Sequence, residues 1–105
     1  MAFYHVEIID QARKEIRQLP GNMRQRIVRS LRSLEQDSRP INSLALEIDN
    51  DLGLLAVGQE LRRIRLETWR IVYVIEDEIQ MVTVLAIRKR PPYQYEDLET
   101  LMRKG

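Results

Sequence analysis

The sequence predicts an α+β fold: a small antiparallel sheet of about four strands, with an N-terminal helical hairpin on one face and a C-terminal helix. The main observation is a change in the period of the apolar residues. In the first third of the chain, strand-like alternation gives way to the spacing of amphipathic helices. The second half holds short β-branched and aromatic segments separated by polar turns. A chain of 105 residues suits one hydrophobic core, so we expect a single domain over residues 1–105.

The first third predicts a strand followed by two helices. Residues 2–8 alternate between apolar and polar side chains, as in a half-buried strand. Apolar residues then recur at helical spacing in two stripes, which are Ala12, Ile16 and Leu19, followed by Met23, Ile27, Leu31 and Leu34. Pro20-Gly21 separates the stripes and predicts the end of the first helix.

The second half predicts a meander of three strands. Residues 36–58 show no sustained period, and we interpret them as a partly structured connection. The strands are expected at residues 61–66, 69–75 and 79–87, and the middle one is apolar on both faces apart from Arg70, as in a central strand. Pro91-Pro92 ends the sheet, and residues 95–104 have the pattern of a final helix.

Composition excludes several kinds of site. There is no cysteine and one histidine, His5, so a zinc site with several Cys or His ligands is excluded and we expect no metal or cofactor. No apolar run approaches the roughly 18 residues of a membrane span, and the N-terminus does not resemble a signal peptide. We therefore expect a cytoplasmic protein that does not enter a membrane.

Basic residues cluster in two segments, although the formal net charge is only +1. The clusters are Arg62, Arg63, Arg65 and Arg70, and then Arg88, Lys89 and Arg90. In a meander the Arg70 end of one strand lies beside the Arg88–Arg90 end of the next, so we expect one positive patch. Side chains two positions apart lie on the same side of a strand, so Arg70 is expected on the side of Val72 and Val74. Arg88 and Arg90 are likewise expected on the side of Val82, Val84 and Ala86. Guanidinium groups suit phosphate, and Tyr93 and Tyr95 follow with rings for stacking and hydroxyls for proton transfer.

Structural interpretations of the same residues stay open. Taken without the clustering, Arg70 is equally well interpreted as an ordinary ion-pair partner of Glu67, Glu7 or another carboxylate. The 88–90 cluster by itself is more typical of a solvated strand end than of a site. The acidic residues 76–78 are interpreted as a turn rather than as a pair of catalytic carboxylates.

The second half resembles one known family. Residues 63–73, Arg-Ile-Arg-Leu-Glu-Thr-Trp-Arg-Ile-Val-Tyr, resemble the arginine-rich hairpin of RelE/ParE toxins from bacterial type II toxin–antitoxin systems. Residues 86–90, Ala-Ile-Arg-Lys-Arg, followed by Tyr93, are similar to the closing strand and basic tail of that family. The order of strand, helical hairpin and meander also matches, apart from residues 36–58, which are longer than usual.

The resemblance implies a ribosome-dependent mRNA endoribonuclease that inhibits translation and needs no metal. It implies that Arg70 and Arg90 stabilise the phosphate. It also implies a tyrosine that activates the nucleophile or stacks on a base, and Tyr93 matches this position, with Tyr95 as the alternative. Further substrate-binding positions are Arg63, Arg65, Arg88, Lys89 and Tyr95. The implied partners are a cognate antitoxin protein and mRNA on the ribosome. Two alternatives stay open: a ParE-like inhibitor of DNA gyrase, and a non-catalytic member that only binds its antitoxin.

Overall fold

The computed structural model describes residues 3–46 and 55–89. Two helices and five strands are formed in this part of the chain. In chain order they are β1 (His5–Ile8), α1 (Asp10–Arg17), α2 (Gly21–Ser33), β2 (Ser43–Ala45), β3 (Gln59–Leu66), β4 (Trp69–Glu76) and β5 (Met81–Lys89). Neither described helix is long and apolar enough to cross a membrane. The expected C-terminal helix at residues 95–104 lies outside the described residues.

The α+β class and the helical hairpin are as expected, but the sheet differs from the prediction in two respects. It has five strands in the order β1-β5-β4-β3-β2, and it is mixed, because β1 runs parallel to β5 while the other pairs are antiparallel. The additional strand, β2, comes from residues 36–58, which were interpreted as a partly structured connection. It is only three residues long, too short for an alternating pattern to show in the sequence.

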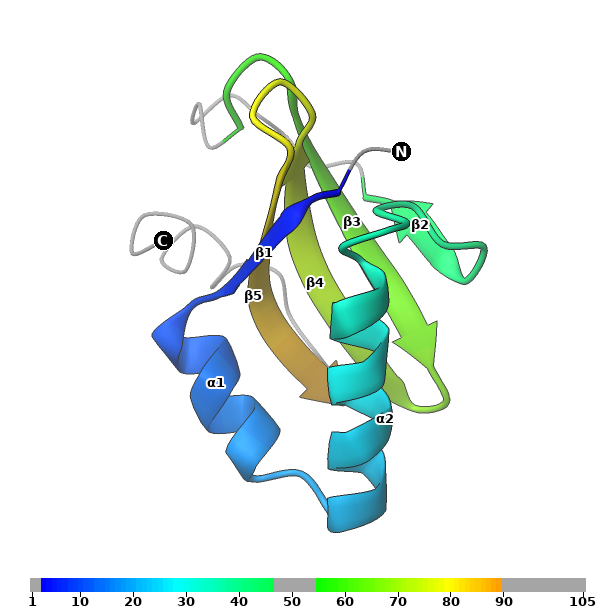
Figure 1. The fold of residues 1–105 in the computed structure, drawn as a ribbon. Coiled ribbons are helices and arrows are strands. Elements are labelled where there is room, and N and C mark those ends of the chain that lie inside the picture. The colour runs from blue at the N-terminus through cyan, green and yellow to red at the C-terminus, as the bar shows by residue number, and fades with distance from the viewer. Residues whose placement is uncertain (1–2, 47–54, 90–105) are drawn as a thin grey trace.

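The core lies on both faces of the central strand, β4. On one face, α1 and α2 pack against alternate residues such as Ile71, Tyr73 and Ile75 (Figure 1). On the other face, Val72 and Val74 pack with residues of β3 and β5, flanked by Leu46, which follows β2, and Leu55, which precedes β3. All positions of β4 from Arg70 to Ile75 are buried, as the apolar run predicted.

Tyr73 joins the sheet to the segment after α2. Its side chain is completely buried, and its hydroxyl donates a hydrogen bond of 2.9 Å to the carbonyl of Ser38. Burial raises the pKa of this phenol, so the hydroxyl keeps its proton and remains a donor. This contact places residues 38–45 along β3, where β2 adds to the sheet edge.

Candidate nucleic-acid interface

Three arginines lie side by side across three neighbouring strands. Arg65 of β3 pairs with Arg70 of β4, and Arg70 pairs with Arg88 of β5. Directly opposed residues of antiparallel strands have Cβ atoms roughly 4.5–5.5 Å apart. Like charges at this separation repel, so the row concentrates positive charge at one end of the sheet. We call these three residues the arginine row. The register brings Arg65 and Arg70 of the first basic cluster beside Arg88 of the second, whereas Arg62 pairs with Tyr73 on the helix face.

The other site candidates take different places. Arg63 lies two residues before Arg65, on the same face of β3, and is half-buried. Lys89 is exposed and pairs with Trp69, on the face of the sheet opposite the row. Arg90, Tyr93 and Tyr95 lie outside the described residues.

A bulge in β5 corrects the expected parity of that strand. The register runs from Val72 opposite Ala86 directly to Tyr73 opposite Val84, so Leu85 is an extra residue in β5. Val84 therefore packs on the helix face, whereas Ala86 packs on the opposite face with Val72. Simple alternation placed Arg88 on the face of Val82 and Val84. The bulge instead puts it on the face of Arg70, so that the two can stand next to each other.

Arg70 is the most buried member of the row, with 2% of its surface exposed. Its Nη1 donates hydrogen bonds of 2.8 Å to the carbonyl of Glu67 and 2.9 Å to that of Trp69. Glu67 has a φ of 56°, the left-handed conformation that a two-residue turn between strands requires. Arg70 therefore holds the carbonyl groups of the β3–β4 turn. The carboxylate of Glu67 instead pairs with Arg26 of α2, at 3.0 Å.

Arg88 is held by a carboxylate from α1. Its Nε donates to Glu15 Oε2 at 3.0 Å, and the second oxygen of Glu15 accepts a bond of 2.8 Å from the backbone N–H of Ile87. β1 pairs with β5 only as far as Val84, so the edge of β5 near Ile87 needs another acceptor. Glu15 supplies that acceptor and orients Arg88 at the same time.

Glu15 is the site residue that sequence reasoning missed. It lies 73 positions from Arg88, and no local pattern relates the two. The available signal was an acidic residue next to the apolar stripe of the first helix, which is weak because such residues are usually solvated.

The row and both core faces lie within the part of the chain that matches a known family. The model of the ParE toxin of the type II toxin–antitoxin system parDE matches residues 6–91. The chain belongs to the ParE toxin family. The matched range includes Arg90 and ends before Tyr93 and Tyr95. No curated protein sequence matches the chain significantly.

The fold of the toxin is similar to that of solved RelE structures. It is similar to the archaeal RelE–RelB complex of Pyrococcus horikoshii, with a TM-score of 0.72 and 22% identity over 87% of this chain and 99% of that one. The RelBE2 toxin–antitoxin complex of Mycobacterium tuberculosis has a TM-score of 0.65 and 23% identity, covering 86% and 94%. The isolated RelE toxin of E. coli has a TM-score of 0.63 and 19% identity, covering 94% and 96%. At these identities the likeness establishes the fold alone.

The opposite end of the toxin carries an ion-pair network instead of a second basic site. Asp77, in the β4–β5 turn, accepts hydrogen bonds from Tyr4 at 2.5 Å and from both Nη atoms of Arg39, the shorter at 2.9 Å. Arg39 also pairs with Glu60 of β3 at 3.2 Å. The acidic turn is therefore structural, as expected, and it ties the N-terminus to the segment after α2.

This network predicts a contribution to acid sensitivity. Hydrogen bonds from Arg39 and Tyr4 lower the pKa of Asp77 in the folded toxin. A carboxyl with a lowered pKa stabilises the fold above its unfolded pKa of about 4, and that stabilisation is lost as the pH falls through the folded pKa. Asp77→Asn should remove this part of the pH dependence when thermal unfolding is followed from neutral pH to about pH 2. The neighbouring Glu78→Gln is the control, and equal profiles for the two variants would contradict the prediction.

Proposed function

We propose that this toxin is a metal-independent endoribonuclease that cleaves mRNA on the ribosome. The arginine row is the observation that supports this function best. Three guanidinium groups at one end of the sheet suit an RNA backbone, because guanidinium donates two parallel hydrogen bonds to phosphate. The fold shared with RelE toxins is consistent with this proposal but does not establish the activity.

In the proposed reaction, a ribose 2′-hydroxyl attacks the adjacent phosphorus atom. The bond from phosphorus to the 5′-oxygen breaks, leaving a 2′,3′-cyclic phosphate and a 5′-hydroxyl. One group must accept the 2′ proton and another must protonate the leaving oxygen. We assign Arg70 and Arg90 to the charge that builds on the phosphate, and Tyr93 to proton transfer, with Tyr95 as the alternative.

The burial of Arg70 defines its part in this proposal. One of its Nη atoms already donates to two turn carbonyls, so Arg70 acts as a fixed positive charge beneath the substrate. Charge in a buried, poorly solvated position acts more strongly than charge in water. Arg65 is the exposed member of the row and is assigned, with Arg63 and Arg88, to binding the RNA backbone. Lys89 is left out of this set, because it lies on the opposite face of the sheet.

Inhibition of DNA gyrase is the second candidate function. The family match is to a ParE toxin, and both Arg70 and Arg88 make hydrogen bonds within the protein. A gyrase inhibitor of the ParE kind needs an exposed binding surface and no catalytic set, so these internal bonds would not hinder it.

One experiment separates the two functions. The toxin is expressed without an antitoxin, and mRNA ends and plasmid topology are followed in the same culture. We expect new mRNA ends within coding regions while supercoiling is unchanged. Altered supercoiling with intact mRNA would replace the ribonuclease with the gyrase inhibitor.

We also propose a cognate antitoxin as partner, acidic and largely disordered before it binds. Two of the three similar structures described above are toxin–antitoxin complexes, one of RelE with RelB and one of RelBE2. A basic toxin surface suits an acidic segment. A protein encoded beside this gene should co-elute with the toxin at moderate salt, and separate elution would contradict the proposal.

A further inference from the structure

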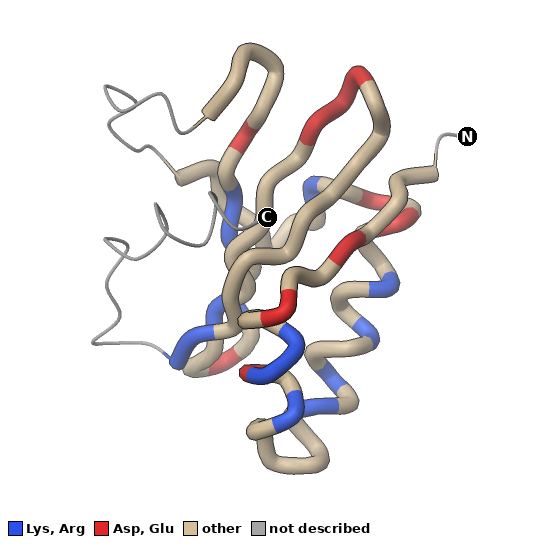
Figure 2. The backbone as a smooth tube through the Cα atoms, turned by 90° about the vertical axis from the view of Figure 1, so that its left-hand side faces the viewer, with Lys and Arg blue, Asp and Glu red and all other residues tan. Residues whose placement is uncertain are grey.

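Helix α2 carries an unusual charge distribution. Between Glu15 and Glu35 the chain has no acidic residue, but it has five arginines, which are Arg17, Arg24, Arg26, Arg29 and Arg32. Four of these five lie on α2. Figure 2 shows the basic positions following one another along this helix, while the β4–β5 turn at the far end is acidic. α2 covers the face of the sheet opposite the arginine row, so this is a separate basic surface.

Of the four arginines of α2, two have structural partners and two have none in the described part of the chain. Arg24 donates to the carbonyls of Ile16, Arg17 and Leu19, and so closes the end of α1. Arg26 pairs with Glu67. The side chains of Arg29 and Arg32 make neither a hydrogen bond nor an ion pair within residues 3–46 and 55–89.

The spacing of the arginines is unfavourable for the helix itself. Arg26, Arg29 and Arg32 follow one another at three-residue intervals, and like charges at this spacing destabilise a helix. No acidic side chain of α2 offsets the repulsion. Arg29 and Arg32 are exposed and support neither the packing nor the stability of the helix, so their guanidinium groups are available to an anionic partner.

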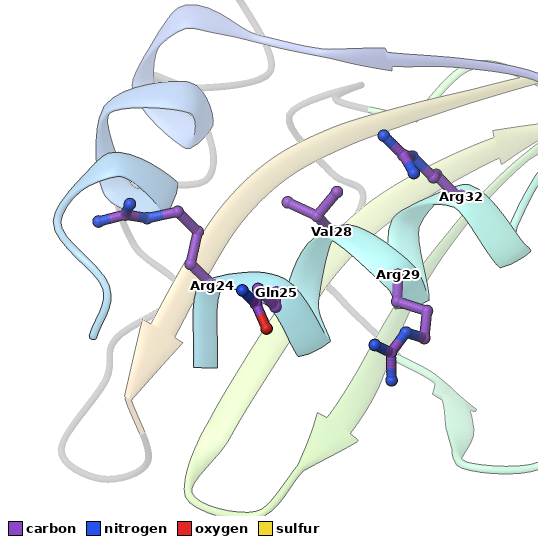
Figure 3. A pocket seen from close by; sticks show the side chains of 5 residues that line it. All are labelled: Arg24, Gln25, Val28, Arg29 and Arg32. Atoms are coloured by element: carbon purple, nitrogen blue, oxygen red, sulfur yellow. The ribbon is translucent and has the colours of Figure 1, made fainter. Parts of the chain in front are cut away.

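The arginines line an open groove on α2. The groove has a volume of about 340 Å³ and is lined by Arg24, Gln25, Val28, Arg29 and Arg32. Figure 3 shows Arg24 reaching toward α1, Val28 and Arg32 on one side of the helix, and Arg29 extending to the other side. The lining has no aromatic ring on which a base could stack, and Val28 is its apolar contributor.

We propose that this groove binds the sugar–phosphate backbone of double-helical RNA, whichever target the toxin acts on. Unpaired guanidinium groups suit phosphates, and without aromatic rings the contact is to the backbone rather than to unstacked bases. Gln25 favours RNA over DNA, because its amide can both donate to a phosphate and accept a hydrogen bond from a ribose 2′-hydroxyl. An acidic polypeptide is less well matched, since docked helices and strands need several apolar anchors and the groove itself offers Val28. The adjoining pocket is more apolar, but it is also lined by Glu35, whose carboxylate would repel an acidic segment.

The test measures binding of the full chain, freed of antitoxin, to a labelled RNA duplex of about 16 base pairs. Fluorescence anisotropy is recorded between roughly 50 and 200 mM salt. The variant Arg29→Gln/Arg32→Gln should lower the slope of log affinity against log salt by about 2, since each lost phosphate contact lowers it by about 1. Its thermal unfolding midpoint should stay the same or rise, because a repulsion has been removed.

The control variant is Lys14→Gln/Arg17→Gln, which removes the same charge from α1, outside the groove lining. We expect it to change the slope much less. An equal loss in the two variants would mean general electrostatics and overturn the proposal, as would failure of the unmodified toxin to bind the duplex.

Two further probes test the choice of ligand. A DNA duplex of the same sequence should bind more weakly, and equal binding would overturn the assignment to RNA. If Arg29→Gln/Arg32→Gln loses binding to poly-glutamate but keeps the RNA duplex, the groove is a site for an acidic polypeptide. Because the duplex is bound and not cut, these results do not depend on the proposed ribonuclease.

Discussion

Replacing Arg70 by alanine is expected to lower the free energy of unfolding of the toxin by about 3 kcal/mol. The side chain is almost fully buried and donates two hydrogen bonds to the carbonyls of Glu67 and Trp69. Hydrogen bonds from a charged donor are worth about 1.5–3 kcal/mol each, and solvent at the exposed turn replaces part of the loss. Removing the arginine also loosens a turn in which Glu67 has a positive φ.

Thermal or urea unfolding measures this effect directly. For a domain of this size the expected fall in Tm is roughly 15 °C. Arg65→Ala is the matched control, since it removes the same charge from the neighbouring position on β3 but from an exposed side chain. We expect it to change stability by less than about 0.5 kcal/mol. Equal stabilities for the two variants would show that Arg70 does not hold the turn.

Replacing Arg90 by alanine is expected to slow mRNA cleavage by on the order of a hundredfold or more. This prediction rests on the proposed ribonuclease, in which Arg90 stabilises charge that develops on the phosphate. Donors that are aimed in advance at developing charge are worth about 3–4 kcal/mol in the transition state. Arg90 is a cleaner test than Arg70, because loss of Arg70 changes stability and activity together.

The assay uses ribosomes programmed with a defined mRNA, because free RNA is expected to be a poor substrate. Lys89→Ala removes the same charge one position earlier, from the face of the sheet opposite the arginine row, and a much smaller loss is expected. Tyr93→Phe keeps the ring and removes the hydroxyl, so retained cleavage would indicate stacking and lost cleavage would indicate proton transfer. Full cleavage by Arg90→Ala would exclude this role of Arg90. If the unmodified toxin leaves the mRNA intact, the ribonuclease itself is excluded and the gyrase inhibitor is favoured.

Local patterns in the sequence were sufficient for most of the secondary structure. The alternation of residues 2–8 and the two helical stripes predicted β1, α1 and α2. The apolar run from Trp69 to Ile75 predicted a strand that is buried on both faces, and β4 is that strand. These features could be predicted because each depends on side-chain periodicity within one element.

Features that depend on pairing over long distances could not be predicted in this way. Periodicity shows that a strand has a buried face but does not name its neighbour, so the parallel pairing of β1 with β5 was missed. The bulge at Leu85 changes the face on which every later residue of β5 lies, and no residue of β5 is a sequence signal that predicts it. The sequence therefore showed that Arg70 and Arg88 would be close, but strict alternation placed Arg88 on the wrong face of β5.

By itself, the sequence determined the fold class, the family resemblance and the convergence of two basic clusters at one end of a sheet, because local periodicity and strand order carry this information. Only the tertiary structure decided how the arginines are used. It buried Arg70 against the turn carbonyls, it brought Glu15 from α1 to Arg88, and it left Arg29 and Arg32 without an ion pair in the described part of the chain. The physical reason is that burial and ion pairing depend on which surfaces meet, and the partners lie up to 73 residues apart in the chain.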